Sequence, residues 1–285
     1  MSTTPPRING SLRMVFECDS RGRSILRELY RQAPVIVQQA LYFDEMLRDM
    51  ACVYILSSGG PVIGGDSFRY SLTLRRGAMA HISTGAATKL AAMHNKEASL
   101  VQHITLDDDA YMEYLPEPMI PCRGARYRSA THIEIAPSAT LLMSEIILSG
   151  RRYYATGERF AYDSLTLLTE SSRPSGKRLF RDRSVAIPSH GIEGVGAMGK
   201  WEIFASLYLL TPEPHAEALY ASIQPYIDRQ RDIAVAVLRL PHRAGLLFRI
   251  LGNESQTIKL TIRELASKVR LQIKGVRLND EFPWR

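Results

Sequence analysis

The stretch ARYRSATHIEIAP, residues 125–137, is followed by ATLLMSEIILSG, residues 139–150, and together they indicate the fold. Apolar and polar residues alternate along both segments, and β-branched and aromatic residues are frequent. Alternation with period two is typical of β-strands that bury one face. We therefore expect two strands joined by a short turn.

The same pattern extends outward over about residues 66–210, where helical periodicity is nearly absent. The other segments that read as strands are DSFRYSLTL at 66–74, AMAHIST at 78–84, ASLVQHITL at 98–106, AYMEYLPEPMIPC at 110–122, ERFAYDSLTLLTES at 158–171 and KWEIFASLYLL at 200–210. Residues 171–199 are rich in Ser, Arg, Gly and Pro, and we expect them to form a mobile loop.

The last third of the chain has a different pattern. Residues 215–230 contain helix formers, and Pro225 is expected to kink or end that helix, whereas residues 232–242 read as a strand. Residues 254–275 predict an amphipathic helix that stops at Gly275. The apolar stripe of this helix consists of Ile258, Ile262, Leu265 and Val269.

These patterns predict a mainly β protein with about two α-helices in its C-terminal third. A chain of 285 residues can bury a large core. We expect a single domain over residues 1–285, β-rich over 10–210 and mixed α/β over 211–285.

Charge and cysteine content restrict the functional classes. The formal net charge is +7, but the cations are scattered, and the densest basic run, at 173–183, reads as a solvated loop. We therefore expect no nucleic acid partner, while an acidic protein partner is another use for the charge. Cys18, Cys52 and Cys122 lie far apart, which argues against a disulfide framework and a thiolate zinc site.

Neither a secretory nor a membrane signal is evident. MSTTPPRING has no basic segment followed by an apolar run, so no signal peptide is expected. No stretch approaches about 18 uninterrupted apolar residues, so we expect no membrane span. The expected compartment is the cytoplasm.

The segment SSGGPVIGGD, residues 57–66, concentrates glycine around one acid, Asp66. Its glycines are Gly59, Gly60, Gly64 and Gly65. It matches neither a dinucleotide fingerprint nor a P-loop, and it precedes a strand instead of a helix. We expect crowded backbone beside Asp66, or simply a bulge or tight turn before the strand.

The sequence contains no strong catalytic or metal-binding pattern. The seven histidines show no ligand spacing, so no tight metal site is predicted. Ser83 and Thr84 suggest an alternative function, a hydrolase or transferase that uses them with a distant acid. Hydroxyl residues on strands are, however, commonly just good strand formers.

Three carboxylates interrupt apolar surroundings: Asp66, Glu145 and Glu158. A carboxylate in a strand is costly to bury unless it is paired or hydrogen-bonded. One hypothesis is that the three acids line an internal, wet passage for a cation. The alternative for Glu145 is an outward-facing position or a salt bridge with Arg151 or Arg152.

Five motifs in order resemble the urease accessory protein D family (UreD, called UreH in some bacteria). They are SSGGPVIGGD at 57–66, GAMAHISTGAATKL at 77–90, EYLPEPMIP at 113–121, EIILSGR at 145–151 and GERF at 157–160. The resemblance extends from about residue 10 to the end of the chain, with these motifs confined to 57–160. Gly85 departs from the family pattern, in which glutamine is commoner.

The resemblance implies a non-enzymatic urease maturation factor whose strands wind in a β-helix-like stack. Members bind the urease apoprotein and UreF directly, and UreG through UreF. Nickel is implied as transient cargo in a water-filled tunnel, with no tightly bound cofactor. Asp66, Glu145 and Glu158 match family acids and become candidate tunnel or interface groups, along with Ser83 and Thr84.

The resemblance also suggests an exposed apolar partner surface. We place it, as a hypothesis, on the C-terminal amphipathic helix and the final FPWR segment, 282–285, although core packing is the commoner fate of such a stripe.

Overall fold

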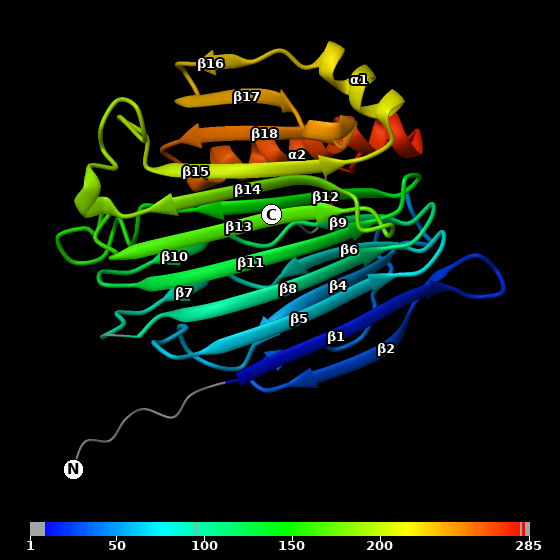
Figure 1. The fold of residues 1–285 in the computed structure, drawn as a ribbon, viewed down its shortest axis with the longest axis horizontal. Helices are drawn as coiled ribbons and strands as arrows, with labels where there is room; N and C mark the ends of the chain where they lie inside the picture. The colour runs from blue at the N-terminus through cyan, green and yellow to red at the C-terminus, as the bar shows by residue number, and fades with distance from the viewer. Residues whose placement is uncertain (1–8, 95, 280, 283–285) are drawn as a thin grey trace.

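The fold consists of two β-sheets that lie face to face, with helices gathered at one end (Figure 1). The computed structural model describes residues 9–94, 96–279 and 281–282. The mainly β architecture and the two C-terminal α-helices predicted from the sequence are confirmed. Among the described residues, no helix is both long and apolar enough to cross a membrane.

The first sheet has seven strands, and its five central strands are parallel. In spatial order they are β14 (Arg178–Ala186), β13 (Ser164–Ser172), β11 (Arg126–Ile135), β8 (Ala98–Leu106), β5 (Ser67–Leu74), β1 (Asn9–Cys18) and β2 (Ser24–Gln32). The two outer strands, β14 and β2, run antiparallel to their neighbours.

The second sheet is larger and mixed. In spatial order it contains β16 (Tyr226–Asp228), β17 (Ile233–Arg239), β18 (Gly245–Gly252), β15 (Ile203–Leu210), β12 (Thr140–Ile147), β9 (Tyr111–Tyr114), β6 (Met79–Thr84), β4 (Ala51–Ser57) and β3 (Val35–Ile36). The short strands β7 (Thr88–Leu90) and β10 (Met119–Pro121) pair with each other in parallel, and β10 also pairs with β12.

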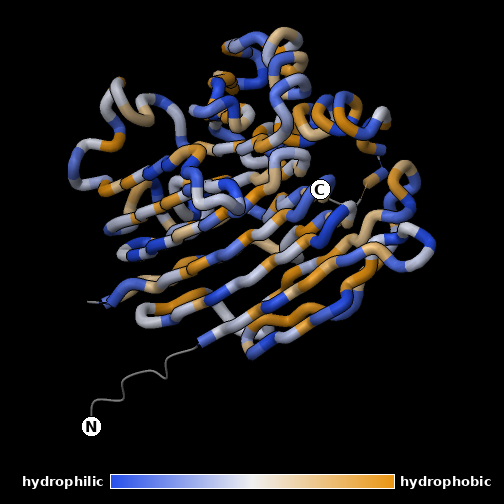
Figure 2. Tube along the Cα trace, turned by 45° about the vertical axis from the view of Figure 1, so that its right-hand side comes forward, coloured by the Kyte–Doolittle hydropathy of each residue, from blue (hydrophilic) through white to orange (hydrophobic). Residues whose placement is uncertain are grey.

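The chain winds between the sheets. From β5 to β13 it passes alternately through the first and the second sheet, and each strand pairs in parallel with the strand one turn earlier. This path is compatible with the β-helix-like stack that the resemblance implies. Along the strands hydrophilic and hydrophobic residues alternate, as a half-buried sheet requires (Figure 2).

Two main hydrophobic cores follow from this arrangement. One lies between the sheets, and the other lies between the second sheet and the helices α1 (Glu213–Ser222) and α2 (Ser255–Lys274). The stripe Ile258, Ile262, Leu265 and Val269 is buried in the second core. Two 3-10 turns, Pro188–His190 and Pro241–Arg243, complete the helical elements that the structure describes.

This packing corrects the expected partner surface. The apolar stripe of α2 is in the core, and so is Phe282, because that ring packs beside Arg270 and His81. The rest of the FPWR segment, 283–285, lies outside the described residues.

Two local predictions also need correction. The first helix, expected within 215–230, covers Glu213–Ser222; it ends before Pro225, as expected, but residues 226–228 form β16. The loop expected over 171–199 is wrong for residues 178–186, which form the edge strand β14. Three exposed arginines, Arg178, Arg181 and Arg183, give this strand the composition of a polar loop.

Candidate functional site

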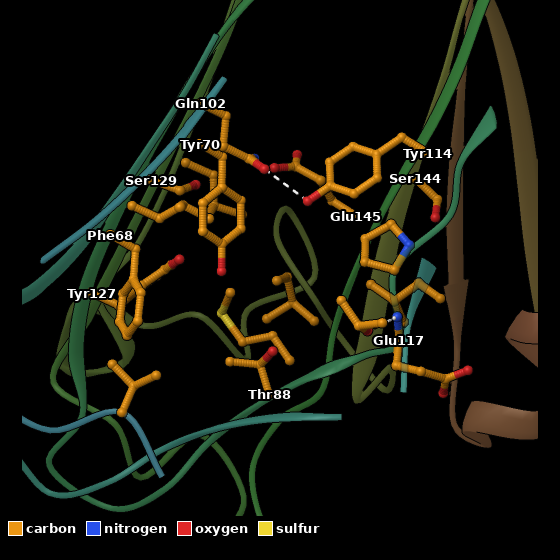
Figure 3. Close-up of a pocket in the computed structure, with 18 of the residues that line it drawn as sticks. Phe68, Tyr70, Thr88, Gln102, Tyr114, Glu117, Tyr127, Ser129, Ser144 and Glu145 are labelled. Atoms are coloured by element: carbon orange, nitrogen blue, oxygen red, sulfur yellow. Dashed lines mark hydrogen bonds between the residues drawn. The ribbon is translucent and has the colours of Figure 1, made fainter. Parts of the chain in front are cut away.

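A cavity of about 160 Å³ lies between the two sheets and is partly open to solvent. Both sheets contribute to its wall, and apolar side chains form much of the lining. Its polar lining includes Tyr70, Gln102, Tyr127 and Ser129 from the first sheet and Tyr114 and Glu145 from the second. Figure 3 shows Gln102, Tyr114 and Glu145 gathered at one end, and Thr88 and Glu117 at the other.

Hydrogen bonds fix the neutral groups of this wall. The Tyr114 hydroxyl donates to Gln102 Oε1 at 2.7 Å, and Gln102 Nε2 donates to Thr131 Oγ1 at 3.0 Å. Burial raises the pKa of the Tyr114 and Tyr127 hydroxyls well above the ordinary value, so both stay neutral. These tyrosine and glutamine side chains therefore contribute oriented dipoles to the wall, and the charged groups of the lining are its carboxylates.

Glu145 is the carboxylate at the polar end. Among the described residues, its side chain has no hydrogen bond or ion pair. Burial raises the pKa of this carboxyl to about 7; the negative charge of Asp182 adds to the shift, and Arg249 opposes it. A carboxyl group that lacks a fixed partner and titrates near neutrality can exchange its proton for a cation.

This geometry disagrees with the alternative considered for Glu145. The group faces the cavity instead of the outside, and neither Arg151 nor Arg152 pairs with it. Arg151 pairs with Glu158, and Arg152 donates to Glu254 at 2.8 Å.

The second carboxylate of the cavity, Glu117, is neutralised. Lys259 of α2 donates to both its oxygens, at 2.7 and 2.8 Å. Thr84 also lines the cavity, and its hydroxyl accepts the backbone N–H of Glu117 at 2.8 Å. This end of the cavity is thus connected to the helical layer by an ion pair.

Asp66 lies outside the cavity lining and braces a turn. Its carboxylate accepts the backbone N–H of Ile63 at 3.0 Å, and its own N–H donates to the carbonyl of Ile63. Gly65, with φ +97°, occupies the left-handed region that this turn requires. Gly64 is crowded by Lys96 and Met93, whereas a side chain at Gly60 would meet no described atom within 4 Å.

Ser83 is also placed away from the cavity. Its hydroxyl donates to the carbonyl of Leu115 at 2.7 Å, which ties β6 to the segment after β9. Among the residues that the structure describes, neither Ser83 nor Thr84 has a hydrogen bond to an imidazole or a carboxylate. The hydroxyls therefore lack the adjacent base that an activated nucleophile needs.

The three acids proposed as one group are separate in space. Glu145 lines the cavity, Asp66 braces its turn, and Glu158 receives two hydrogen bonds from Arg151, at 2.9 and 2.6 Å. Over residues 9–94, 96–279 and 281–282, no cluster of three or more His, Cys, Asp or Glu is arranged to hold a metal.

Comparison with known proteins decides the family. The family described as UreD urease accessory protein matches residues 9–285. Urease accessory protein UreD 2 of Brucella suis biovar 1 (strain 1330) is 39% identical over 277 residues, which cover 97% of this chain and 91% of the relative. Urease accessory protein UreD of Photorhabdus laumondii is 38% identical over 279 residues, covering 97% and 86%. The chain belongs to the UreD family. Membership supports a role in urease maturation, since the relatives are accessory proteins.

Two motifs of the UreD resemblance, EIILSGR and GERF, contact each other directly. Gly150, in the EIILSGR motif, has φ +148°, and a Cβ there would lie 2.5 Å from the carbonyl oxygen of Glu158. The next residue, Arg151, pairs with the Glu158 side chain, and that hydrogen bond lowers the Glu158 pKa. Glycine is required because the two backbones approach so closely.

A third UreD motif, EYLPEPMIP, contains a buried acid, Glu113, that the sequence patterns did not single out. Glu113 is fully buried and receives a hydrogen bond from Arg270 Nη2 at 2.8 Å. Arg270, at the end of α2, also pairs with Asp44, while His81 Nδ1 lies 2.8 Å from Glu113. In the sequence, Glu113 is marked only by its place in the EYLPEPMIP motif.

Proposed function

We propose that this chain is a urease maturation factor that scaffolds the nickel-delivery complex and provides part of the nickel route. In this proposal it binds the urease apoprotein and UreF directly, and UreG through UreF. Nickel is transient cargo. The support is membership of the UreD family together with a cavity between the sheets, whose polar end presents Glu145, a carboxyl group without a hydrogen bond or ion pair among the described residues.

The composition of the cavity suits temporary binding. Nickel(II) accepts oxygen ligands, and one carboxylate with neutral hydroxyl and amide groups attracts the ion without enclosing it. Asp66 and Glu158 then support the walls and loops around the route. We keep all three acids as proposed functional groups, with Glu145 as the one that meets the cargo.

The test is complementation in cells that contain urease and its other accessory proteins but lack their own UreD. We expect Glu145→Gln to retain UreF in co-purification and to lower both nickel per urease and urease activity severalfold. Nickel is measured by mass spectrometry on purified urease. The matched control is Glu134→Gln, which removes an exposed carboxylate on β11.

The outcomes separate the two parts of the proposal. Wild-type nickel content in the Glu145→Gln strain would refute the route and leave the scaffold. Normal urease maturation without this chain would refute both. Turnover of a substrate by the purified chain alone would favour the hydrolase or transferase alternative, which no contact of Ser83 or Thr84 with the described part of the chain supports.

A further inference from the structure

A row of polar side chains crosses the inner face of the first sheet. Cα pairing places its members at one register position on five neighbouring strands: Tyr70, Gln102, Thr131, Thr169 and Asp182. Residues paired in this way point to the same face of a sheet. The register two residues along is apolar on three of these strands, with Leu72, Ile104 and Ile133.

The second sheet carries a matching row. Glu145 of β12 pairs with Ser206 of β15, which pairs with Arg249 of β18. Each step is one strand spacing, so Glu145 and Arg249 are about 10 Å apart along the sheet. The two rows face each other across the space between the sheets.

The rows begin at the cavity and end at the edge of the first sheet. Tyr70, Gln102 and Glu145 line the cavity. At the other end, Arg249 Nη2 donates to Asp182 Oδ2 at 2.7 Å, across the sheets. Asp182 lies on the edge strand β14, beyond which the second sheet continues with β18, β17 and β16 (Figure 1). The Asp182 and Arg249 side chains are 20% and 33% exposed.

Further contacts hold this pair in place. The Tyr208 hydroxyl donates to Asp182 Oδ2 at 2.6 Å, and Arg249 Nη1 donates to the hydroxyl of Ser206. Bonds to an ionised group are the strong ones, so the pair joins both sheets at this point. Backbone pairing already aligns the strands within each sheet, so the Asp182–Arg249 ion pair is not required for that alignment.

The middle of the row contains an unsatisfied group. Thr169 is 1% exposed, and its Oγ1 has no hydrogen-bond partner among the described residues. A buried hydroxyl without a partner costs free energy unless water or an ion reaches it. This favours a hydrated row over a dry polar seam.

We propose that the two rows form a second hydrophilic branch of the cavity, and that the Asp182–Arg249 ion pair closes its outer end to small hydrated cations. The proposal extends the nickel route above and rests on the cavity serving as a passage. The closed end keeps a cation on Glu145 from leaving along the two rows. A guanidinium group in a narrow opening repels cations and also fills the opening.

The test measures access to the row in the purified chain. Thr169→Cys places a thiol midway, and its reaction with a small cationic methanethiosulfonate is followed by peptide mass spectrometry, which separates it from the native cysteines. We expect slow labelling when the ion pair is intact. The double substitution Asp182→Asn with Arg249→Met removes both charges together, and labelling should become at least tenfold faster.

Two controls make the result specific. Ile133→Cys probes the apolar register and should stay slow in the same double variant. The exposed pair Glu217–Arg239 provides a matched ion pair, and Glu217→Gln with Arg239→Met should leave labelling at position 169 unchanged. Should the first double variant fail to fold, Arg249→Met alone, which removes the guanidinium group and leaves Asp182 bonded to Tyr208, is expected to accelerate labelling at least threefold.

Equal labelling with and without the ion pair, in folded protein, would overturn the proposal. Equal acceleration at positions 133 and 169 would overturn it as well, because it would indicate general loosening of the two sheets. Neither measurement involves urease or nickel, so failure here is distinguishable from failure of the proposed function.

Discussion

Glu145 combines a strand position with an environment in which its charged form is disfavoured. Burial raises the pKa of its carboxyl to about 7, against an ordinary value of 4.5. Proton loss therefore falls in the neutral range, where binding of a divalent cation competes with the proton. Cation affinity at this carboxyl should rise with pH across neutrality.

The same shift predicts a pH-dependent stability difference for Glu145→Gln. Between the unfolded and folded pKa values the native state holds a proton that the unfolded chain has lost, so the wild type loses stability as pH rises. From pH 5 to 8 the variant should gain about 2 kcal/mol relative to the wild type, after allowance for water in the cavity. Urea unfolding at each pH measures this. Glu134→Gln serves as the control, and parallel curves for Glu145→Gln and the wild type would contradict the prediction.

At the scale of elements, helix α2 is anchored by a buried charge. Arg270 is 0% exposed and pairs with Glu113 on β9 and with Asp44 before β4. Two carboxylates and one guanidinium are costly to bury together, but removing one partner leaves the others uncompensated. The network therefore fixes where the helix ends against the second sheet.

Arg270→Met should consequently destabilise the protein by about 3–5 kcal/mol. Loss of the cation leaves Glu113 and Asp44 buried without a counter-charge. Arg231→Met is the matched control, because Arg231 pairs with Glu264 of the same helix at the surface, 34% and 55% exposed. That change should cost less than about 1 kcal/mol. Equal costs in urea unfolding would show that burial of the Arg270 network is unimportant.

Local sequence patterns predicted the elements better than the contacts between them. Period-two alternation predicted the central strands, and helical spacing predicted α2. Burial of one face of a strand or helix requires apolar residues at a regular spacing, and this spacing is visible in the local sequence. Edge strand β14 was missed because three exposed arginines interrupt its apolar residues. Arg270 was missed because its partners lie 157 and 226 residues away.

The same limit applies to the candidate site. Asp66, Glu145 and Glu158 share one local signature, an acid in apolar surroundings. Their environments differ only through contacts that folding creates: a turn, a cavity and an arginine. A single sequence cannot separate these three outcomes, because each satisfies the requirement that a buried carboxylate be compensated or neutral.

At the scale of the whole molecule, winding makes the two sheets interdependent. Strands of the first and second sheets alternate from β5 to β13, so no single cut in the chain separates one sheet from the other. The C-terminal elements from α1 to α2 are consecutive, and with the second sheet they enclose the second core. The Arg270 network connects this last unit to β9, inside the wound part.

This topology predicts how the expected single domain opens. In native-state hydrogen exchange, amides of β5 and β6 should report the same opening free energy, because neither sheet persists without the other. In Arg270→Met, the opening free energy reported by amides of α2 should be about 3 kcal/mol lower than that reported by amides of β5. Protection of β5, β8 and β11 that outlasts protection of β6, β9 and β12 would contradict the interdependence. Arg231→Met should leave the difference in opening free energy between α2 and β5 as it is in the wild type. The ion pair of Arg231 is with Glu264 of α2 and does not reach the wound strands.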